Sequence, residues 1–249
     1  MTFNHKKTSQ EIEAMRQGGR ILAEVLGALA VAVRPGITTG ELNDLAHEKI
    51  IKLKAKPAFL GYQSFPASIC ISINNEIVHG IPGSKVVSAG DIVTLDLGVT
   101  YKGLITDSAI TVAVGKISPE AQNLLKGTKS ALVAGIKQVK PGNRIGDISA
   151  AIQAELTKYG LSVIHDLSGH GVGREVHEEP PIPNFGRAGT GMVLEEGMTL
   201  AIEPMASLGS KEIVLQPDGW TYTSADGSLT AQFEHTVAVT ADGHRILTQ

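Results

Sequence analysis

Two aspartates in one predicted β-hairpin, Asp96 and Asp107, are the residues whose types and spacing most directly suggest chemistry. They lie eleven residues apart, in a segment that alternates apolar and polar residues around a turn at Tyr101-Lys102-Gly103. If Thr100 faces Gly103, the register puts the two carboxylates directly opposite each other on one face. Like charges about 5 Å apart repel, so a cation between them is the simplest compensation. The alternative is two solvated aspartates on an exposed hairpin.

Three further residues have types that suit the same cation site. Glu203 ends a predicted strand immediately before a proline, and Glu234 lies in the middle of the predicted strand 231–239. His170 lies in a predicted turn between glycines, which let the backbone pass close to something and expose the imidazole. Taken singly, each has the ordinary explanation of a surface acid or a loop histidine. Together, four carboxylates and one imidazole suit a pair of divalent first-row cations bridged by carboxylates.

A sequence repeat identifies the elements that must position these residues. Residues 34–50 and 140–156 are similar at a constant offset of 106, and each copy begins with a basic residue, a proline and a glycine. This pattern predicts helices over about 9–33 and 119–139 that end there, and second helices that begin near Thr39 and Ile145. β-rich sequence follows each pair, at 68–115 and 161–240.

The repeat predicts a single catalytic domain, 1–249, built from two related α+β halves at about 9–115 and 116–249, with any shared site where they meet. Two helix stops of the same chemistry can also coincide by chance, although the positions that follow them agree as well. At this offset plus one residue, Asp96 corresponds to Glu203.

The composition is that of an ordinary globular protein, with 249 residues, 42% hydrophobic and 19% charged. A net charge of −3 gives no electrostatic footprint for nucleic acid. No apolar run is long enough to predict a membrane span, and residues 1–7 lack the apolar core of a secretory signal. The single cysteine, Cys70, cannot form an internal disulfide. We therefore expect a cytoplasmic protein with no membrane partner and no specific nucleic acid partner.

From about residue 9 to residue 247, the sequence resembles the methionine aminopeptidases, type I in particular. The motifs that carry the resemblance are Cys70-Ile-Ser-Ile-Asn-Asn-Glu-Ile-Val-His-Gly-Ile-Pro82, Gly90-Asp-Ile-Val-Thr-Leu-Asp96, Thr106-Asp107-Ser108, Gly169-His-Gly-Val-Gly173, His177-Glu-Glu-Pro-Pro181, Leu194-Glu-Glu-Gly-Met198 and Ala231-Gln-Phe-Glu-His235. The resemblance implies an α+β pita-bread (creatinase/aminopeptidase) fold, with two pseudo-symmetric α/β halves around a central antiparallel sheet. It also implies metal-dependent removal of the N-terminal methionine from nascent proteins with a small second residue, by a monomer that works near the ribosome.

The resemblance also implies roles for individual residues. It makes five residues the ligands of two divalent ions (Mn, Fe, Co or Zn): Asp96, Asp107, His170, Glu203 and Glu234. In the family pattern Asp107 and Glu234 bridge both ions. Glu203 would act as general base and then acid for an ion-bridged hydroxide. His177 would stabilise the oxyanion, and His79 would position the scissile amide.

Eight residues are expected to bind the substrate: Phe59, Tyr62, Phe65, Cys70, His79, Val176, His177 and Trp220. The chain departs from the family pattern at two of them, because a small residue is expected at position 59 and an aromatic residue at position 176. Phe59 and Val176 look like an exchange of bulk that conserves volume and alters shape. The alternative is that Phe59 belongs only to the core.

Two rival functions stay open at this stage. An aminopeptidase P or prolidase of the same fold uses similar ligands to cleave next to proline, and usually carries an additional N-terminal domain. A non-catalytic binding protein on the same scaffold would have lost its ion ligands, whereas all five are present in this sequence. The native metal, the side-chain selectivity and the oligomeric state are not fixed by the sequence.

Overall fold

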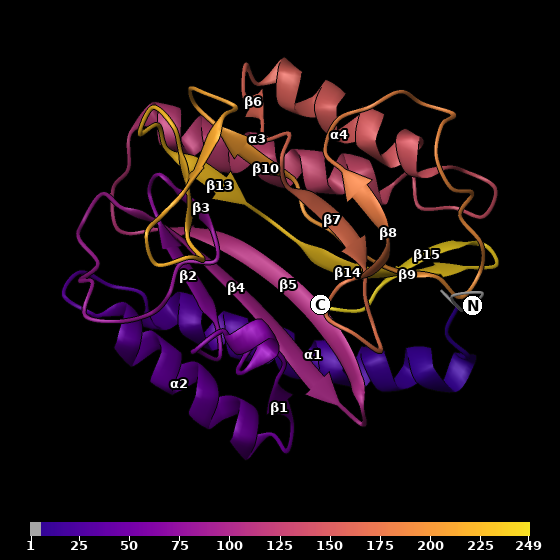
Figure 1. Cartoon of the computed structure of the whole chain (residues 1–249), viewed down its shortest axis with the longest axis horizontal. Coiled ribbons are helices and arrows are strands. Elements are labelled where there is room, and N and C mark those ends of the chain that lie inside the picture. Colours follow the sequence, from indigo (N-terminus) through magenta and orange to yellow (C-terminus); the bar gives the residue numbers. More distant parts are fainter. Residues whose placement is uncertain (1–5) are drawn as a thin grey trace.

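A computed structural model describes residues 6–249. Two helix pairs lie on opposite sides of a layer of strands (Figure 1). The helices are α1 (Ser9–Ala32), α2 (Thr39–Lys52), α3 (Pro119–Ile136) and α4 (Ile145–Lys158), with a short 3-10 helix η1 (Tyr62–Ser64). The strands are β1 (Lys56–Pro57), β2 (Cys70–Ile73), β3 (Glu76–Val78), β4 (Ile92–Tyr101), β5 (Leu104–Ala113), β6 (Ser162–Val163), β7 (Ser168–Gly171), β8 (Glu178–Pro183), β9 (Thr199–Ile202), β10 (Met205–Ser207), β11 (Ile213–Leu215), β12 (Tyr222–Ser224), β13 (Thr230–Gln232), β14 (His235–Thr240) and β15 (Gly243–Ile246).

None of the helices within residues 6–249 is long and apolar enough to cross a membrane. The expectation that the chain lacks a secretory signal concerns residues 1–7, of which residues 1–5 lie outside the described part.

The helix boundaries follow local capping chemistry. Thr8 and Thr38 cap the N-termini of α1 and α2, each in a capping box with a glutamate three residues later. The predicted starts of the second helices are confirmed, since α2 and α4 are both 14 residues long and begin at Thr39 and Ile145. α3 ends at Ile136, slightly before the predicted boundary, because the chain already turns at residues 137–139 ahead of the proline.

The β4–β5 hairpin has a different register from the predicted one. Lys102 and Gly103 form its two-residue turn, and Asp107 faces Gly98 instead of Asp96. The turn lies one residue later than predicted because both turn residues adopt positive φ angles, 52° and 79°, as a tight hairpin that matches the strand twist requires. The shift moves the partner of Asp107 by two residues, so both aspartates keep the predicted common face.

The other face of β4 is apolar and packs against the first helix pair. Its four predicted core residues are all fully buried: Val93, Leu95, Leu97 and Val99. They belong to a core cluster that includes Leu22 of α1 and Leu42 of α2. A separate cluster joins α3 and α4 to the strands of the second half. Each half thus has its own core, and the carboxylate face of β4 and β5 is turned away from the first helix pair.

The second half contains a five-stranded antiparallel sheet in the order β15-β14-β9-β7-β8. The two halves meet where β5 runs beside the start of β14, at residues 107–109 and 234–236, which we call the seam. Thr236 Oγ1 accepts a hydrogen bond from the Asp107 N–H at 2.9 Å and donates to the Asp107 carbonyl at 2.8 Å. Ser108 Oγ donates to the Glu234 carbonyl at 2.6 Å, and the Glu234 N–H donates to the Ala109 carbonyl at 2.8 Å. The seam therefore fixes Asp107 next to Glu234.

Two glycines of α1 test how tightly this helix is packed. A Cβ atom at Gly19 would lie 2.1 Å from the Leu247 carbonyl oxygen, whereas one at Gly27 would meet nothing within 4 Å. We expect Gly19→Ala to lower the free energy of unfolding by about 1–3 kcal/mol because the backbone must shift. The matched control Gly27→Ala should raise it by about 0.5–1 kcal/mol, since alanine favours the helix. Denaturant unfolding of the two variants measures both effects, and equal shifts would contradict the packing.

Candidate active site

All five predicted cation ligands line one cavity of about 320 Å³. The first half contributes Asp96 from β4 and Asp107 from β5, and the second half contributes His170 from β7. Glu203 directly follows β9, and Glu234 directly precedes β14. The cavity therefore lies where the two halves meet.

The pairing of β9 with its two neighbours explains why the second-half ligands converge. His170 faces Ala201 of β9, and Ala201 faces Thr236 of β14. Because side chains alternate along a strand, Glu203 shares the face of Ala201, and Glu234 shares the face of Thr236. Three side chains from three segments thus project on the same side of the sheet, towards β5.

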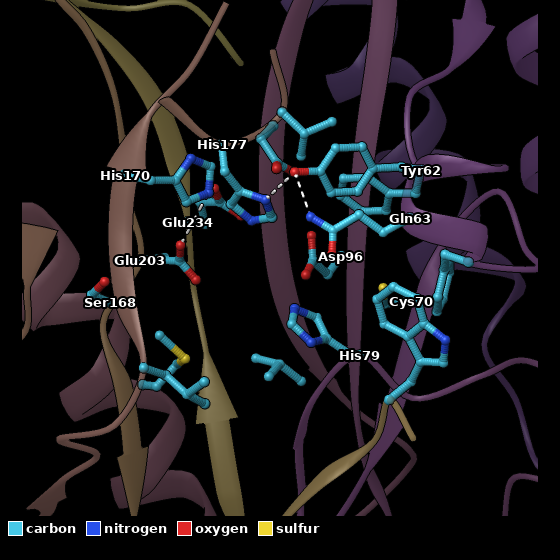
Figure 2. A pocket seen from close by; sticks show the side chains of 18 of the residues that line it. Tyr62, Gln63, Cys70, His79, Asp96, Ser168, His170, His177, Glu203 and Glu234 are labelled. Carbon is cyan, nitrogen blue, oxygen red and sulfur yellow. Dashed lines mark hydrogen bonds and ion pairs between the residues drawn. The ribbon is translucent and has the colours of Figure 1, made fainter. Parts of the chain in front are cut away.

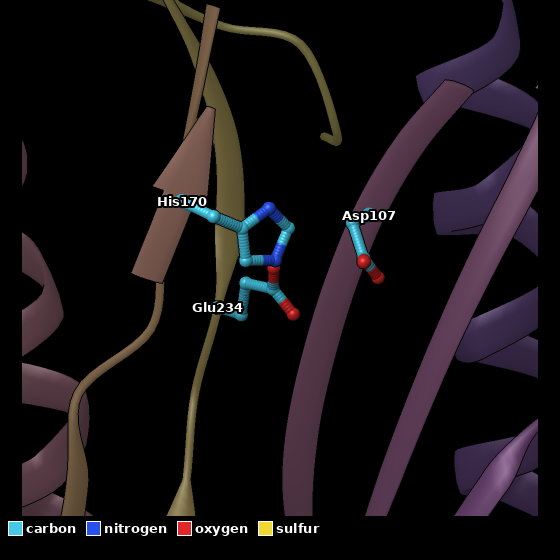
Figure 3. A group of neighbouring side chains, drawn as sticks. All are labelled: Asp107, His170 and Glu234. Carbon is cyan, nitrogen blue, oxygen red and sulfur yellow. The ribbon is translucent and has the colours of Figure 1, made fainter. Parts of the chain in front are cut away.

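Three of the ligands form one compact group (Figure 3). Donor atoms of Asp107, His170 and Glu234 all lie within 4.8 Å of one another. Glu203 and Asp96 lie outside this group of three. The Oε1 atom of Glu203 is 3.4 Å from Nε2 of His170, and Asp96 shares the β4–β5 face with Asp107.

Burial of the acids excludes the alternative of solvated surface carboxylates. Asp96, Asp107 and Glu234 are only 7%, 4% and 2% exposed. Among residues 6–249, one buried carboxylate oxygen of each of these three has no hydrogen-bond partner. An unpaired buried charge is strongly unfavourable, so these oxygens call for a positive partner.

Burial shifts the pKa values of the acids in the site far from their ordinary range. Burial raises the pKa of Asp107 to about 7. Burial, together with the charge of Asp107, also raises the pKa values of Asp96 and Glu234 well above their usual range. Burial lowers the pKa of His170 to about 3, so this imidazole is neutral at pH 7 and its ring nitrogens can act as ligands.

The donor set matches the chemistry of divalent first-row cations. Carboxylate oxygens and one neutral imidazole suit manganese, iron, cobalt or zinc, and the buried acceptors without partners would be satisfied by such an ion. His170 Nδ1 lies 2.9 Å from the Gly171 carbonyl, which fixes the proton on Nδ1 and leaves Nε2 as the ligand atom. The residues present therefore fit a divalent metal.

His79 and His177, the two histidines predicted to act on the substrate without binding metal, lie in the same cavity. The rings of His170 and His177 are in contact, with centroids 4.4 Å apart. His79 follows β3 with a φ angle of 60°, a backbone conformation that a residue other than glycine adopts at some energetic expense. Burial, reinforced by His177, lowers the pKa of His79 to about 4, and burial also lowers the pKa of His177. Both rings are hence neutral at pH 7.

The predicted side-chain pocket is an apolar cluster at one side of the cavity. Figure 2 shows Cys70 and Tyr62 on one side, and His170 and Glu203 on the other. The cluster contains all six predicted apolar and aromatic residues: Phe59, Tyr62, Phe65, Cys70, Val176 and Trp220. Phe59 fills space beside Gly98, where a Cβ atom would lie 2.6 Å from its ring. Phe59 is therefore both a core residue and part of the cavity wall.

Two local predictions about the ligands are wrong. His170 lies in strand β7 instead of a turn, and the glycines beside it allow close strand packing, since a Cβ atom at Gly169 would lie 2.4 Å from the Ala201 carbonyl. Glu234 lies between β13 and β14 instead of mid-strand. The strand is interrupted there because the Glu234 N–H donates to Ala109 across the seam.

Four polar residues of the site were not predicted: Gln63, Asp166 and Ser168 in the cavity wall, and Gln232 beside Glu203. Gln232 donates from Nε2 to Glu203 at 3.0 Å, and Gln63 donates to the Tyr62 hydroxyl at 3.2 Å (Figure 2 draws the second contact). Gln232 precedes Glu234 by two residues, so strand alternation could have placed it on the same face. No comparable signal precedes Gln63, which has a left-handed backbone with a φ angle of 46° in η1.

Known proteins share this fold and sequence. Residues 13–241 match metallopeptidase family M24. A methionine aminopeptidase from Clostridium perfringens is 49% identical over 97% of both chains. The structure of a methionine aminopeptidase from Thermotoga maritima superposes with a TM-score of 0.96, at 46% identity and over 98% of each chain. A prolidase from Pyrococcus furiosus gives a TM-score of 0.79 at 25% identity, and the match covers 65% of that longer chain.

The family match and the near-complete coverage confirm the α+β pita-bread fold that the sequence predicted. The M24 assignment also agrees with the buried carboxylate and imidazole group, whose donors fit a divalent metal. The chain therefore belongs to metallopeptidase family M24.

Proposed function

We propose that this protein is a methionine aminopeptidase, which hydrolyses the peptide bond after the N-terminal methionine of chains with a small second residue. The observation that carries the proposal is one cavity in which the carboxylate and imidazole group adjoins an apolar cluster that can receive an apolar side chain. The names of the full-length relatives support the same reaction. An apolar pocket beside hydrolytic machinery selects the residue whose bond is cleaved.

We further propose that Asp96, Asp107, His170, Glu203 and Glu234 would hold two divalent ions. Bound ions would lower the pKa of a coordinated water towards neutrality and so supply a nucleophile at pH 7. The remaining tasks, which are to hold the peptide, move the proton and stabilise developing charge, belong to the side chains.

Glu203 is the proposed proton carrier. Burial and the nearby charges of Asp96 and Asp107 raise its pKa. A carboxyl group whose pKa is raised can take a proton from the attacking water and return it to the leaving amine. The hydrogen bond from Gln232 holds one oxygen of Glu203, which supports a single orientation through both transfers.

His177 is proposed to donate a hydrogen bond to the carbonyl oxygen as negative charge develops on it. Its Nδ1 lies 3.0 Å from the Tyr62 hydroxyl, and that hydroxyl oxygen already accepts from the Gln63 amide. We assign the hydroxyl proton to the bond with Nδ1, in which case the neutral imidazole carries its own proton on Nε2. This tautomer is the one that can donate to the substrate.

His79 is proposed to position the scissile amide or its leaving nitrogen. Its ring lies between two aromatic neighbours, with centroids 6.3 Å from Trp220 and 6.1 Å from Tyr222. These contacts support the left-handed backbone at His79 and orient the ring in the cavity.

We infer that the enzyme works as a cytoplasmic monomer on nascent chains near the ribosome. The buried, unpaired Cys70 suits a reducing compartment.

The exchange of bulk between Phe59 and Val176 keeps methionine as the preferred side chain. Discrimination against leucine depends on the shape of the pocket, because one methylene changes the binding free energy by only about 1–3 kcal/mol.

A peptide panel tests the proposed reaction. With metal supplied, Met-Ala-Ser should be cleaved and Met-Trp-Ser should be cleaved at least about tenfold more slowly, because a bulky second residue crowds the carboxylate group. Release of methionine measured by chromatography gives both rates. Equal rates for Ala and Trp at the second position would refute the small-residue rule. Cleavage confined to an Xaa-Pro dipeptide would identify a prolidase, and no cleavage by metal-bound protein would identify a binding protein.

Metal removal should expose the energetic cost of burying the acids. In the chelated protein, the folded pKa of Asp107, about 7, lies above its usual value of 3.8. The folded state then binds protons more readily than the unfolded state, so we expect stability to fall as pH rises from about 4 to about 7. Adding manganese or cobalt at pH 7.5 should raise the melting temperature and restore turnover. Full turnover in exhaustively chelated protein would rule out a metallohydrolase.

Two histidine variants separate ion binding from catalysis. His170→Ala should weaken metal affinity by at least about tenfold and abolish turnover. His177→Ala should keep the affinity and lower kcat by about a hundredfold, because it removes a donor to the oxyanion. Titration calorimetry and kinetics distinguish the two, with His244→Ala, an exposed histidine of β15, as the control. Loss of metal from His177→Ala would make that residue a ligand instead.

A further inference from the structure

We infer that Lys7 and Glu178 form an ion pair that positions residues 173–177, and through them Val176 and His177, against the substrate cavity. The catalytic part of this inference rests on the proposed function, whereas the positioning of the segment does not. Lys7 and Glu178 are positioning residues, since neither lines the cavity.

Lys7 is buried, which is unusual for a lysine. Its side chain is 0% exposed, and its Nζ contacts a carboxylate oxygen of Glu178. A buried ammonium needs a charged or polar partner, so this pairing holds the two groups together. The Lys7 backbone N–H donates to the Gly197 carbonyl at 2.7 Å, and Lys6 forms a β-bridge with Met198. The backbone that carries the Lys7 ammonium is therefore fixed against residues 197–198.

Glu178 links this ammonium to the backbone of the segment. One carboxylate oxygen contacts Lys7, and the other accepts the N–H groups of Arg174 at 2.6 Å and Glu175 at 3.1 Å. Glu178 itself begins β8 and pairs with Gly171 of β7. One side chain thus closes residues 174–178 into a turn between two anchored strands.

The stem of Lys7 also passes directly against Gly173. A Cβ atom at Gly173 would lie 2.4 Å from Cε of Lys7, and the glycine has a φ angle of 148°. On β5, the Ile105 N–H donates to the Gly173 carbonyl at 2.6 Å. The start of the segment is therefore held between Lys7 and β5, and its end is held by Glu178.

The segment needs such anchors because residues 173–177 belong to no helix or strand. It nevertheless carries Val176, which is 2% exposed in the pocket wall, and His177, which bonds to Tyr62. A displacement of about 1 Å in a catalytic group can lower turnover by about a hundredfold. The buried ion pair therefore sets the position of two cavity residues without touching the substrate.

Hydrogen exchange tests the positioning step without any use of activity. In Lys7→Met, the amides of Arg174 and Glu175 should exchange at least about tenfold faster, because Glu178 loses its anchor. Lys6→Met is the matched control: it is the same substitution one residue earlier, at an exposed ion pair with Glu195. The control should leave the exchange of these two amides unchanged within about twofold. Unchanged exchange in Lys7→Met would overturn the inference.

A double-mutant cycle tests the catalytic consequence. Lys7→Met should lower kcat for Met-Ala-Ser by about ten- to a hundredfold with metal affinity retained. In the His177→Ala background, the same substitution should lower kcat by less than about twofold, because the effect on kcat passes through His177, whereas displacement of Val176 in the pocket wall would change KM. An equal loss in both backgrounds would overturn the inference in favour of a general structural role.

If Lys7→Met does not fold, Glu178→Gln replaces it in both tests, because the amide keeps an acceptor for the two N–H groups and loses the charge that faces Lys7. If the wild-type protein with metal does not cleave methionyl peptides, the proposed function fails, and the exchange experiment still decides whether the ion pair positions the segment.

Discussion

Repulsion among four carboxylates buried around one cavity is the constraint on which the rest of the site depends. Such a group is unfavourable in a folded protein unless a cation neutralises it or protons occupy it. Burial raises the pKa values of Asp107 and Glu234, and for Glu234 the charges of Asp107, Glu203 and Asp96 add to the effect. The fold sustains it because each half has a separate hydrophobic core behind its helix pair, away from the acids. The apolar packing that stabilises the fold thus lies at the periphery, and the buried acids that destabilise it lie at the centre, where the chemistry occurs.

The seam between the halves converts this constraint into geometry. Hydrogen bonds between Asp107 and Thr236, and between Ser108 and Glu234, fix β5 beside β14 through side chains instead of a regular strand ladder. A continuous ladder would have kept Glu234 within a strand. The interruption before β14 lets its backbone N–H bond to Ala109 while its carboxylate enters the cavity. The same feature therefore joins the halves and aims a ligand.

Periodicity and capping made much of the fold predictable from sequence. The common face of Asp96 and Asp107 survived an error in register because the error was two residues, the period of a strand. Helix starts at Thr39 and Ile145 follow from local chemistry. By contrast, Lys7 acts through a contact with Glu178, a distant partner that local patterns do not identify. The sequence predicts a turn at His170 because glycines that permit close strand packing look the same in sequence as glycines that permit a turn.

The division of the ligands between the halves bears on how many domains the chain has. The first half supplies Asp96 and Asp107, and the second supplies His170, Glu203 and Glu234. Either half alone would expose the seam. The first half would hold only two of the five proposed ligands, and the second half only three. A cation bound between them would then stabilise the contact between the halves as well as the site, because ion binding favours the state in which all ligands are assembled. We therefore infer that residues 1–249 act as a single catalytic domain, in which ion binding and the packing of the two halves are one linked equilibrium.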